Sequence, residues 1–180
     1  MESVTQFIEK DLRLTVNQKK SSITTPTKAK FLGFHIMNHM GKLFCRPSKS
    51  AKQRFRNKLK YLTSRKRPGT FKEILTQLNQ VTVGWINYYK ISFMKSFLEE
   101  TQNWLRHRVR QLIWKRWKKV STRYNQLKRL GIDHDNALKT AASRKGYWRI
   151  SRSEVLHRSI TNKRLIQWGL KDLILLYERK

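Results

Sequence analysis

Carboxylates are scarce in this sequence of 180 residues. Eleven Asp and Glu stand against 41 Lys and Arg, which gives a net charge of +30 at pH 7. Repulsion of this size destabilises a compact chain, so a polyanionic partner is the simplest reason to retain it. Aromatic residues are plentiful, since six Trp, six Tyr and eight Phe provide large side chains for a core. The composition therefore excludes a disordered basic tail and predicts a folded protein that binds a polyanion.

Cysteines and long apolar runs are also missing. The single Cys45 excludes an internal disulfide framework and a multi-cysteine zinc site, and it fits a reducing compartment. No run approaches the roughly 18 consecutive apolar residues of a membrane span, and residues 1–12 lack the pattern of a signal peptide. We therefore expect a soluble, intracellular protein with no membrane partner.

Catalytic motifs are absent as well. Two-metal phosphoryl transfer needs carboxylates that converge within about 4 Å, and the only closely spaced Asp pair is Asp133 and Asp135. Side chains two apart point away from each other at a helix start, where Asp133 is better explained as an N-cap. No hydrolase, metalloprotease or nucleotide-binding motif occurs. We expect no metal, no cofactor and no catalysis by this chain alone.

Hydrophobic periodicity predicts a mainly α-helical fold with a small β-hairpin at the N-terminus. The expected strands are 12–16, 31–36 and 42–46. The expected helices are 2–11, 48–64 with Ser48 as N-cap, 70–89 with a capping box of Thr70 and Glu73, 94–120, a helix from Asp133 to near Gly146, two short helices from Ser153 and Thr161, and a final segment at 170–177. Residues 147–152 are expected to be irregular or extended.

Three blocks without any acid hold most of the positive charge. Residues 12–72 contain seventeen Lys and Arg, residues 101–132 contain ten, and residues 136–153 contain five. Ion pairs within such blocks are impossible, so these charges are expected to face solvent or phosphate. A charge run is more often a solvated face, but three of them on one aromatic-rich chain favour nucleic acid.

Aromatic residues lie among the cations at two places. Arg110, Trp114 and Lys118 recur every fourth residue, so we expect an exposed row on the helix at 94–120; the alternative, a buried Trp114, stays open. Residues 144–152 mix cations with two aromatics around a glycine, and a structural tryptophan is the alternative there. The expected nucleic-acid-binding residues are Arg65, Lys66, Arg67, Arg106, Arg110, Trp114, Lys118, Arg144, Lys145, Trp148, Arg149 and Arg152.

The segment 77–89, QLNQVTVGWINYY, resembles the signature of the maturase-specific region in group II intron-encoded reverse transcriptases. Residues 14–17 (LTVN) and 31–34 (FLGF) resemble the last two reverse-transcriptase blocks, at the end of the palm. Residues 104–108 (WLRHR) and 144–149 (RKGYWR) resemble the thumb and the C-terminal basic domain of the bacterial members. These blocks occur in the order of the family and cover nearly the whole chain.

The resemblance implies a palm remnant at 1–47, a three-helix thumb or maturase-specific domain at 48–120, and a small basic DNA-binding-like helical domain at 121–180. Gly84 interrupts the helical pattern and suggests close packing or a close backbone approach. The expected core residues of the motif are Leu78, Gly84, Trp85, Tyr88 and Tyr89.

The polymerase carboxylates of the family do not occur in this sequence, so the resemblance implies the C-terminal part of an RNA-directed DNA polymerase. It implies group II intron RNA as partner, target DNA as a second one, a palm fragment or a second copy as further candidates, and a bacterial cytoplasm. We expect a maturase that stabilises folded intron RNA by electrostatic clamping. Two alternatives are half of a split or truncated reverse transcriptase, and a general architectural nucleic-acid-binding protein.

Overall fold

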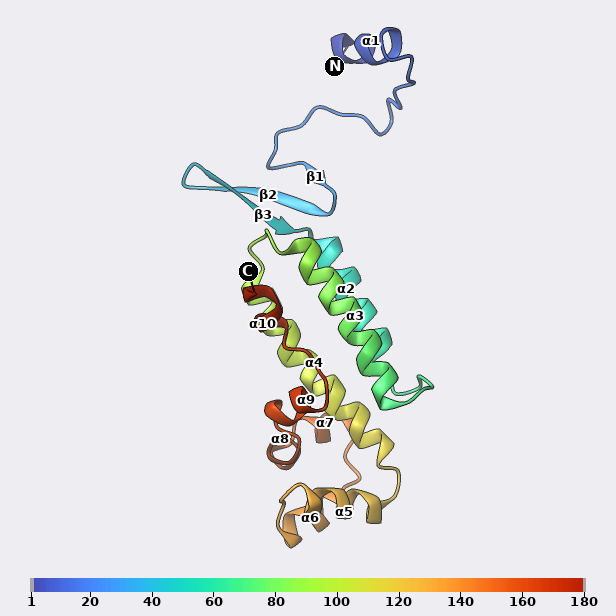
Figure 1. The fold of residues 1–180 in the computed structure, drawn as a ribbon, viewed down its shortest axis with the longest axis vertical. Helices are drawn as coiled ribbons and strands as arrows, with labels where there is room; N and C mark the ends of the chain where they lie inside the picture. The colour runs from blue at the N-terminus through green and yellow to red at the C-terminus, as the bar shows by residue number, and fades with distance from the viewer. Residues whose placement is uncertain (1, 180) are drawn as a thin grey trace.

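In the computed structural model, which describes residues 2–179, a small sheet stands at one end of an elongated array of helices (Figure 1). Helix α1 (Glu2–Lys10) lies beyond the sheet and has no buried residue. The long helices α2, α3 and α4 run along the molecule, and α5 and α6 form its opposite end (Figure 1). The predicted fold class, mainly helical with a small N-terminal β region, is confirmed.

The sheet is antiparallel and has the order β1 (Lys30–Phe31), β2 (Phe34–His39), β3 (Lys42–Pro47). Met40 and Gly41 join β2 to β3 with φ of 49° and 75°, as a two-residue hairpin turn requires. The predicted hairpin is therefore confirmed, although its first strand begins at Phe34. A second turn at Leu32 and Gly33 precedes it, and a Cβ on Gly33 would collide with the hydroxyl of Tyr89.

The strand expected at 12–16 is wrong, because this segment pairs with no strand in the described part of the chain. Its backbone turns back toward α1 instead. The N–H of Leu14 donates to the carbonyl of Ile8 at 3.1 Å, and the N–H of Val16 donates to the carboxylate of Glu9 at 3.3 Å. Alternation of apolar and polar residues produces a strand only where a neighbouring strand can satisfy the backbone.

Helices α2 (Lys49–Leu62), α3 (Phe71–Tyr89) and α4 (Lys95–Arg116) form the body of the protein. The predicted caps are present: Ser48 accepts from the N–H of Ala51, and Thr70 and Glu73 form a reciprocal capping box. Their shared core contains Ala51, Phe55, Leu59, Leu75, Leu78, Ile86, Tyr89, Leu98, Leu105, Val109 and Ile113.

The helix expected at 94–120 is too long, since α4 ends at Arg116 and α5 (Val120–Arg129) begins after a break. The carbonyl of Trp117 accepts from Nε of Arg123 at 2.8 Å, which holds the chain in this turn. Val120 is therefore not part of the buried stripe of α4; it is 48% exposed at the start of α5. The sequence pattern did not predict α5 as a separate helix.

Four short helices lie between α5 and the C-terminal helix. Three of them begin at a side chain that accepts a backbone hydrogen bond, and one begins after Gly146. They are α6 (His134–Ala141), α7 (Tyr147–Ser151), α8 (Glu154–Ser159) and α9 (Asn162–Gln167). Asp133 caps α6 as predicted, but α6 ends five residues short of Gly146. The two helices expected to start near Ser153 and Thr161 are present, and these residues are their N-caps. The irregular backbone expected at 147–152 is wrong, because α7 packs on α4 and buries Ile150.

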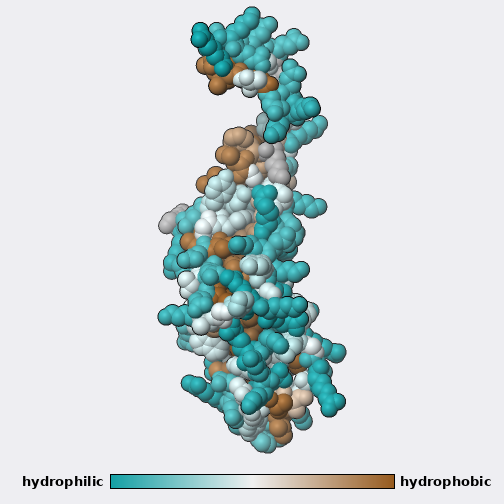
Figure 2. Space-filling view, turned by 90° about the vertical axis from the view of Figure 1, so that its right-hand side faces the viewer, coloured by the Kyte–Doolittle hydropathy of each residue, from teal (hydrophilic) through white to brown (hydrophobic). Residues whose placement is uncertain are grey.

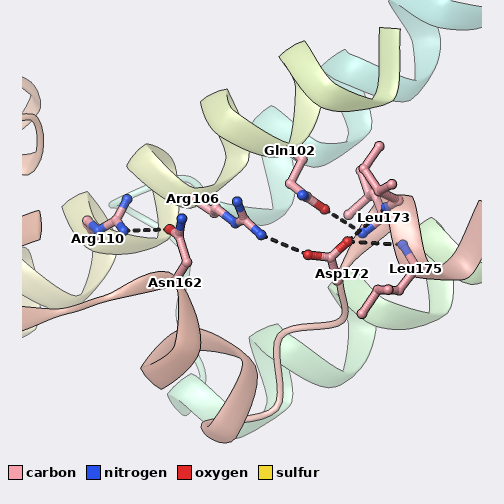
Figure 3. A network of polar contacts seen from close by, with 8 residues as sticks. Gln102, Arg106, Arg110, Asn162, Asp172, Leu173 and Leu175 are labelled. Carbon is pink, nitrogen blue, oxygen red and sulfur yellow. Dashed lines mark hydrogen bonds and ion pairs between the residues drawn. The ribbon is translucent and has the colours of Figure 1, made fainter. Parts of the chain in front are cut away.

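The C-terminal segment then returns along the body of the protein. Asn79 of α3 donates from Nδ2 to the carbonyl of Gly169 at 2.6 Å and accepts from the N–H of Lys171 at 3.0 Å. Helix α10 (Leu173–Glu178) lies against α4, where Oε1 of Gln102 accepts from the N–H of Leu173 at 2.6 Å (Figure 3). The face of α4 opposite α2 is therefore covered by the end of the same chain.

Candidate nucleic-acid interface

The exposed row expected on α4 does not form. Arg110 is 3% exposed and Trp114 is 1% exposed, so both belong to the interior. Only Lys118 is exposed, and it lies beyond the end of the helix. Helical spacing shows which residues share a face of α4, but it cannot show that the C-terminal helices cover that face.

The guanidinium of Arg110 is held by neutral oxygens from the covering segment. Its Nε donates to the carbonyl of Ile160 at 2.8 Å, and its Nη2 donates to Oδ1 of Asn162 at 2.8 Å (Figure 3). Burial, together with the nearby charge of Arg106, lowers the pKa of Arg110 to about 10. Arg110 therefore joins α4 to the start of α9 and is not available to a phosphate.

Trp114 lies in a second internal cluster. Its ring meets that of Trp117 edge to face at 5.8 Å, and the guanidinium of Arg123 lies 4.9 Å from its centroid. A fully buried Trp of this kind contributes mainly packing. The alternative of a buried Trp114 is therefore the one that the structure shows.

Arg106 is paired and not free. Its Nη2 lies 2.8 Å from Oδ2 of Asp172, and the two side chains are only 14% and 12% exposed (Figure 3). The other oxygen of Asp172 caps α10 by accepting from the N–H groups of Ile174 and Leu175. Arg106 therefore fastens the C-terminal segment, and its charge is already neutralised.

A different cluster of cations remains at the surface, around Tyr147. Arg65, from the turn between α2 and α3, places its guanidinium 5.1 Å from the Tyr147 ring centroid, and Nζ of Lys115 from α4 lies at the same distance. Two cations 50 residues apart in sequence thus meet on one aromatic ring, an arrangement that cation–π attraction favours. No sequence motif predicts this contact.

The residues next to these three extend the cluster. Lys66 follows Arg65, and residues 144–149 lead into and through α7; their cations are exposed, and Trp148 is 38% exposed. We use the name Tyr147 surface for Arg65, Lys66, Lys115, Arg144, Lys145, Tyr147, Trp148 and Arg149. Arg152, just after α7, is also exposed.

Arg67 differs from its two neighbours. Its Nη2 donates to Oε1 of Gln77, and its guanidinium lies 5.6 Å from the ring of Tyr61. The residue is half-buried, so it ties the turn to α3. We therefore leave Arg67 outside the Tyr147 surface.

Carboxylates neutralise little of the charge. Among residues 2–179, ion pairs join Arg56 to Glu100, Lys95 to Glu178, and Arg106 to Asp172. The face in Figure 2 is hydrophilic over most of the helical body, with hydrophobic patches mainly toward the N-terminal end. The excess positive charge of the chain therefore stays at its surface.

The motif at 77–89 lies mostly inside the helical body. Leu78 is fully buried, Trp85 stacks on Phe55 with centroids 4.3 Å apart, and Tyr89 is 6% exposed. Tyr88, which was expected in the core, is instead 52% exposed. Its hydroxyl donates to the carbonyl of Leu32 at 3.0 Å, so it links α3 to the turn before β2.

Gly84 does not show the close packing expected of it. It is exposed, and a Cβ built on it would meet no atom within 4 Å. The missing side chain leaves a short stretch of α3 backbone uncovered. No contact among residues 2–179 accounts for this glycine.

No helix in residues 2–179 has the length and apolar character needed to cross a membrane. Within the same residues, no three side chains of His, Cys, Asp or Glu come together as a possible metal site.

Residues 52–131 match the family model of the group II intron, maturase-specific domain. The matched stretch runs from the first turn of α2 to Gly131, just after α5, and it contains the motif at 77–89. The resemblance seen in the sequence is thereby confirmed. Comparison with curated proteins gives no match for this chain.

Proposed function

We propose, from the match of residues 52–131 to the group II intron maturase-specific domain, that this chain binds group II intron RNA and stabilises its splicing-competent fold. The Tyr147 surface is the observation that supports this best. It brings Arg65 of the α2–α3 turn and Lys115 of α4 onto the ring of Tyr147, and the exposed cations of residues 144–149 are adjacent to that ring in sequence. A surface built from distant segments can span phosphates of more than one RNA domain.

The mechanism is electrostatic. Folded RNA packs phosphates closely, and their repulsion opposes tertiary contacts between RNA domains. A protein that neutralises these phosphates releases condensed counterions, so its affinity falls steeply with salt. If about eight phosphates are engaged, the slope of log K against log salt is roughly −6 to −7. The RNA performs the splicing chemistry, and the protein supplies only binding energy.

The test is a binding titration of the full chain with a structured group II intron RNA at several salt concentrations. We expect a slope near that value and splicing at a lower magnesium concentration than the RNA needs alone. Equal affinity for the intron RNA and for arbitrary duplex DNA would contradict the proposal and favour the general architectural alternative. Binding of target DNA is a separate arm of the same titration.

A second candidate function rests on the sheet. Phe31, Leu32 and Leu43 are 69%, 65% and 62% exposed, which leaves apolar side chains uncovered at β1, at the turn after it and at β3. A palm fragment that covers these side chains would complete a split reverse transcriptase. A second copy of this chain is the alternative partner. Primer extension after co-expression with a palm fragment tests this, since the chain alone is expected to extend no primer.

We also propose that the chain works in three parts, with 1–47 as the palm remnant, 48–120 as the thumb and 121–180 as the basic C-terminal domain. The polar contacts of Asn79, Gln102 and Arg106 with the returning segment support a fixed arrangement of the second and third parts.

A further inference from the structure

A groove of about 570 Å³ lies on the helical body, outside the Tyr147 surface. It forms where the start of α3, the end of α4, α5 and the turn after α9 come together. Its lining residues are Phe71, Lys72, Ile113, Arg116, Trp117, Gln126 and Trp168. Three of the seven are aromatic, two are cations, and none is a carboxylate.

The aromatic wall of the groove is held in place. Trp117 meets the buried Trp114 edge to face, and its own carbonyl accepts from Arg123. Trp168 is the C-cap residue of α9 and is 39% exposed, so a large part of its indole faces solvent. Fixed and partly exposed indoles provide flat apolar surface at little cost in side-chain entropy.

The polar wall contains a donor with no acceptor among residues 2–179. Nη2 of Arg116 donates to the carbonyl of Gly69 at 2.7 Å, but its Nε is buried without a hydrogen-bond partner. A buried unpaired donor costs free energy, so the described residues hold the Arg116 guanidinium with less than a full set of acceptors. Glu73, which follows Lys72 in the sequence, is already engaged in the capping box of α3.

We infer that this groove binds one unpaired RNA nucleotide, its base against Trp117 and Trp168 and its phosphate at Lys72 and Arg116. The inference rests on the proposed function, because it adds a base-recognition site to a chain that binds RNA. Stacking on aromatic side chains accepts any base, so the site selects for an unpaired base and not for a sequence. Two cations without a carboxylate complement a phosphate and disfavour an apolar peptide side chain, which carries no charge.

The experiment uses the full chain and three RNA hairpins of equal length. One has a single bulged adenosine, one has an abasic residue at the bulge, and one is fully paired. The wild-type chain should bind the adenosine bulge about 5- to 150-fold more tightly than the abasic bulge, since stacking of one base on aromatic side chains is worth that factor. This comparison requires no variant.

Variants assign the preference to the groove. Trp168→Ala should bring the adenosine and abasic hairpins to equal affinity and leave the fully paired hairpin within about twofold of wild type. Ile166→Ala is the matched control, because Ile166 is on the same helix, is 44% exposed and does not line this groove. It should keep the preference, and thermal melting of each variant confirms that it is folded.

The possible failures are distinct. If the wild-type chain binds all three hairpins equally, or if the preference survives both Trp168→Ala and Trp117→Leu, the groove is not a nucleotide site and the proposed function is untouched. If no RNA binds, the proposed function itself fails. If the chain forms a dimer in sedimentation and Trp168→Ala dissociates it, the occupant is a second copy and the inference is overturned.

Discussion

Nη2 of Arg106 lies 2.8 Å from Oδ2 of Asp172, and this contact holds the C-terminal segment against α4. The two side chains are nearly buried, so the pair is poorly screened by solvent. One residue is in the middle of α4 and the other caps α10, and the pair therefore holds the end of the chain against its longest helix. Composition alone would assign Arg106 to RNA binding, but the structure uses it to hold α10 against α4.

Asp172→Asn tests this pair. It keeps an oxygen for the cap of α10 but leaves Arg106 buried without a counter-charge, so the free energy of unfolding should fall by about 3 kcal/mol. Chemical denaturation measures it. Glu100→Gln is the matched control, because its pair with Arg56 is exposed and should be worth about 0–1 kcal/mol. Equal losses in the two variants would show that burial of the Arg106 pair is unimportant.

Substitution of Trp114 should affect stability, whereas substitution of Trp148 should affect RNA binding. Trp114→Ala empties a buried site and should destabilise the protein by about 3–5 kcal/mol. Trp148→Ala, at a residue 38% exposed on the Tyr147 surface, should melt close to wild type and bind RNA more weakly. Thermal melting and RNA titration of both variants check this. If Trp114→Ala weakened RNA binding without loss of stability, and Trp148→Ala destabilised the protein, the assignment of Trp148 to the RNA interface would be wrong.

The charges of the Tyr147 surface should set the salt dependence. The triple variant Arg144→Gln, Lys145→Gln, Arg149→Gln should reduce the slope of log K against log salt by about 2–3 if each cation meets a phosphate. The control triple Lys19→Gln, Lys20→Gln, Lys28→Gln removes the same charge from the segment before the sheet, and its slope should change less. Identical slopes for the two triple variants would indicate that RNA responds to the total charge of the protein and does not contact the Tyr147 surface in particular.

Stability should fall in mild acid because of two histidines. Burial lowers the pKa of His107 and of His157 below the ordinary 6.5, and the charge of Arg110 lowers both as well. Their rings lie 5.0 Å apart. The folded state therefore binds fewer protons than the unfolded chain, so the histidine contribution is complete above pH 6.5 and is lost as the pH falls through 6.5 toward the folded pKa values.

Melting temperatures at pH 7.5 and pH 5.5 measure this effect. The double variant His107→Gln, His157→Gln should show a smaller drop between the two pH values than the wild type. An unchanged drop would mean that other groups control the acid response.

Gly84→Ala should stabilise the protein by about 1 kcal/mol, since alanine favours a helix and the structure leaves room for its methyl group. Denaturation measures the gain. RNA titration of the same variant shows whether the uncovered backbone at Gly84 is also a contact: weaker binding by a more stable protein would identify it as one. A loss of stability would contradict the open space seen beside Gly84.

Local chemistry made many features of this chain predictable. The caps at Ser48, Thr70 and Asp133 and the helix starts near Ser153 and Thr161 were predicted correctly, because a cap depends on a hydrogen bond within three residues. The hairpin followed from a two-residue turn at Met40 and Gly41, which is equally local.

Predictions that needed a distant partner fared worse. The strand at 12–16 lacks a neighbour, and the irregular segment at 147–152 becomes helical where it packs on α4. The row of Arg110 and Trp114 was placed on the correct face of one helix, and that face is covered by residues 50 positions later in the chain.

The sequence by itself determined that this protein is helical, strongly basic and similar to a maturase domain, because periodicity, charge and motif are properties of neighbouring residues. Only the tertiary structure decided which cations stay at the surface. Arg106 and Arg110 enter the interior since the returning C-terminal segment supplies a carboxylate and two neutral oxygens to satisfy them, whereas Arg65 and Lys115 meet at Tyr147 in solvent. Whether a cation is available to RNA depends on which side chains and carbonyls the fold brings next to it. Such partners can be far away in the sequence, so local patterns do not reveal them.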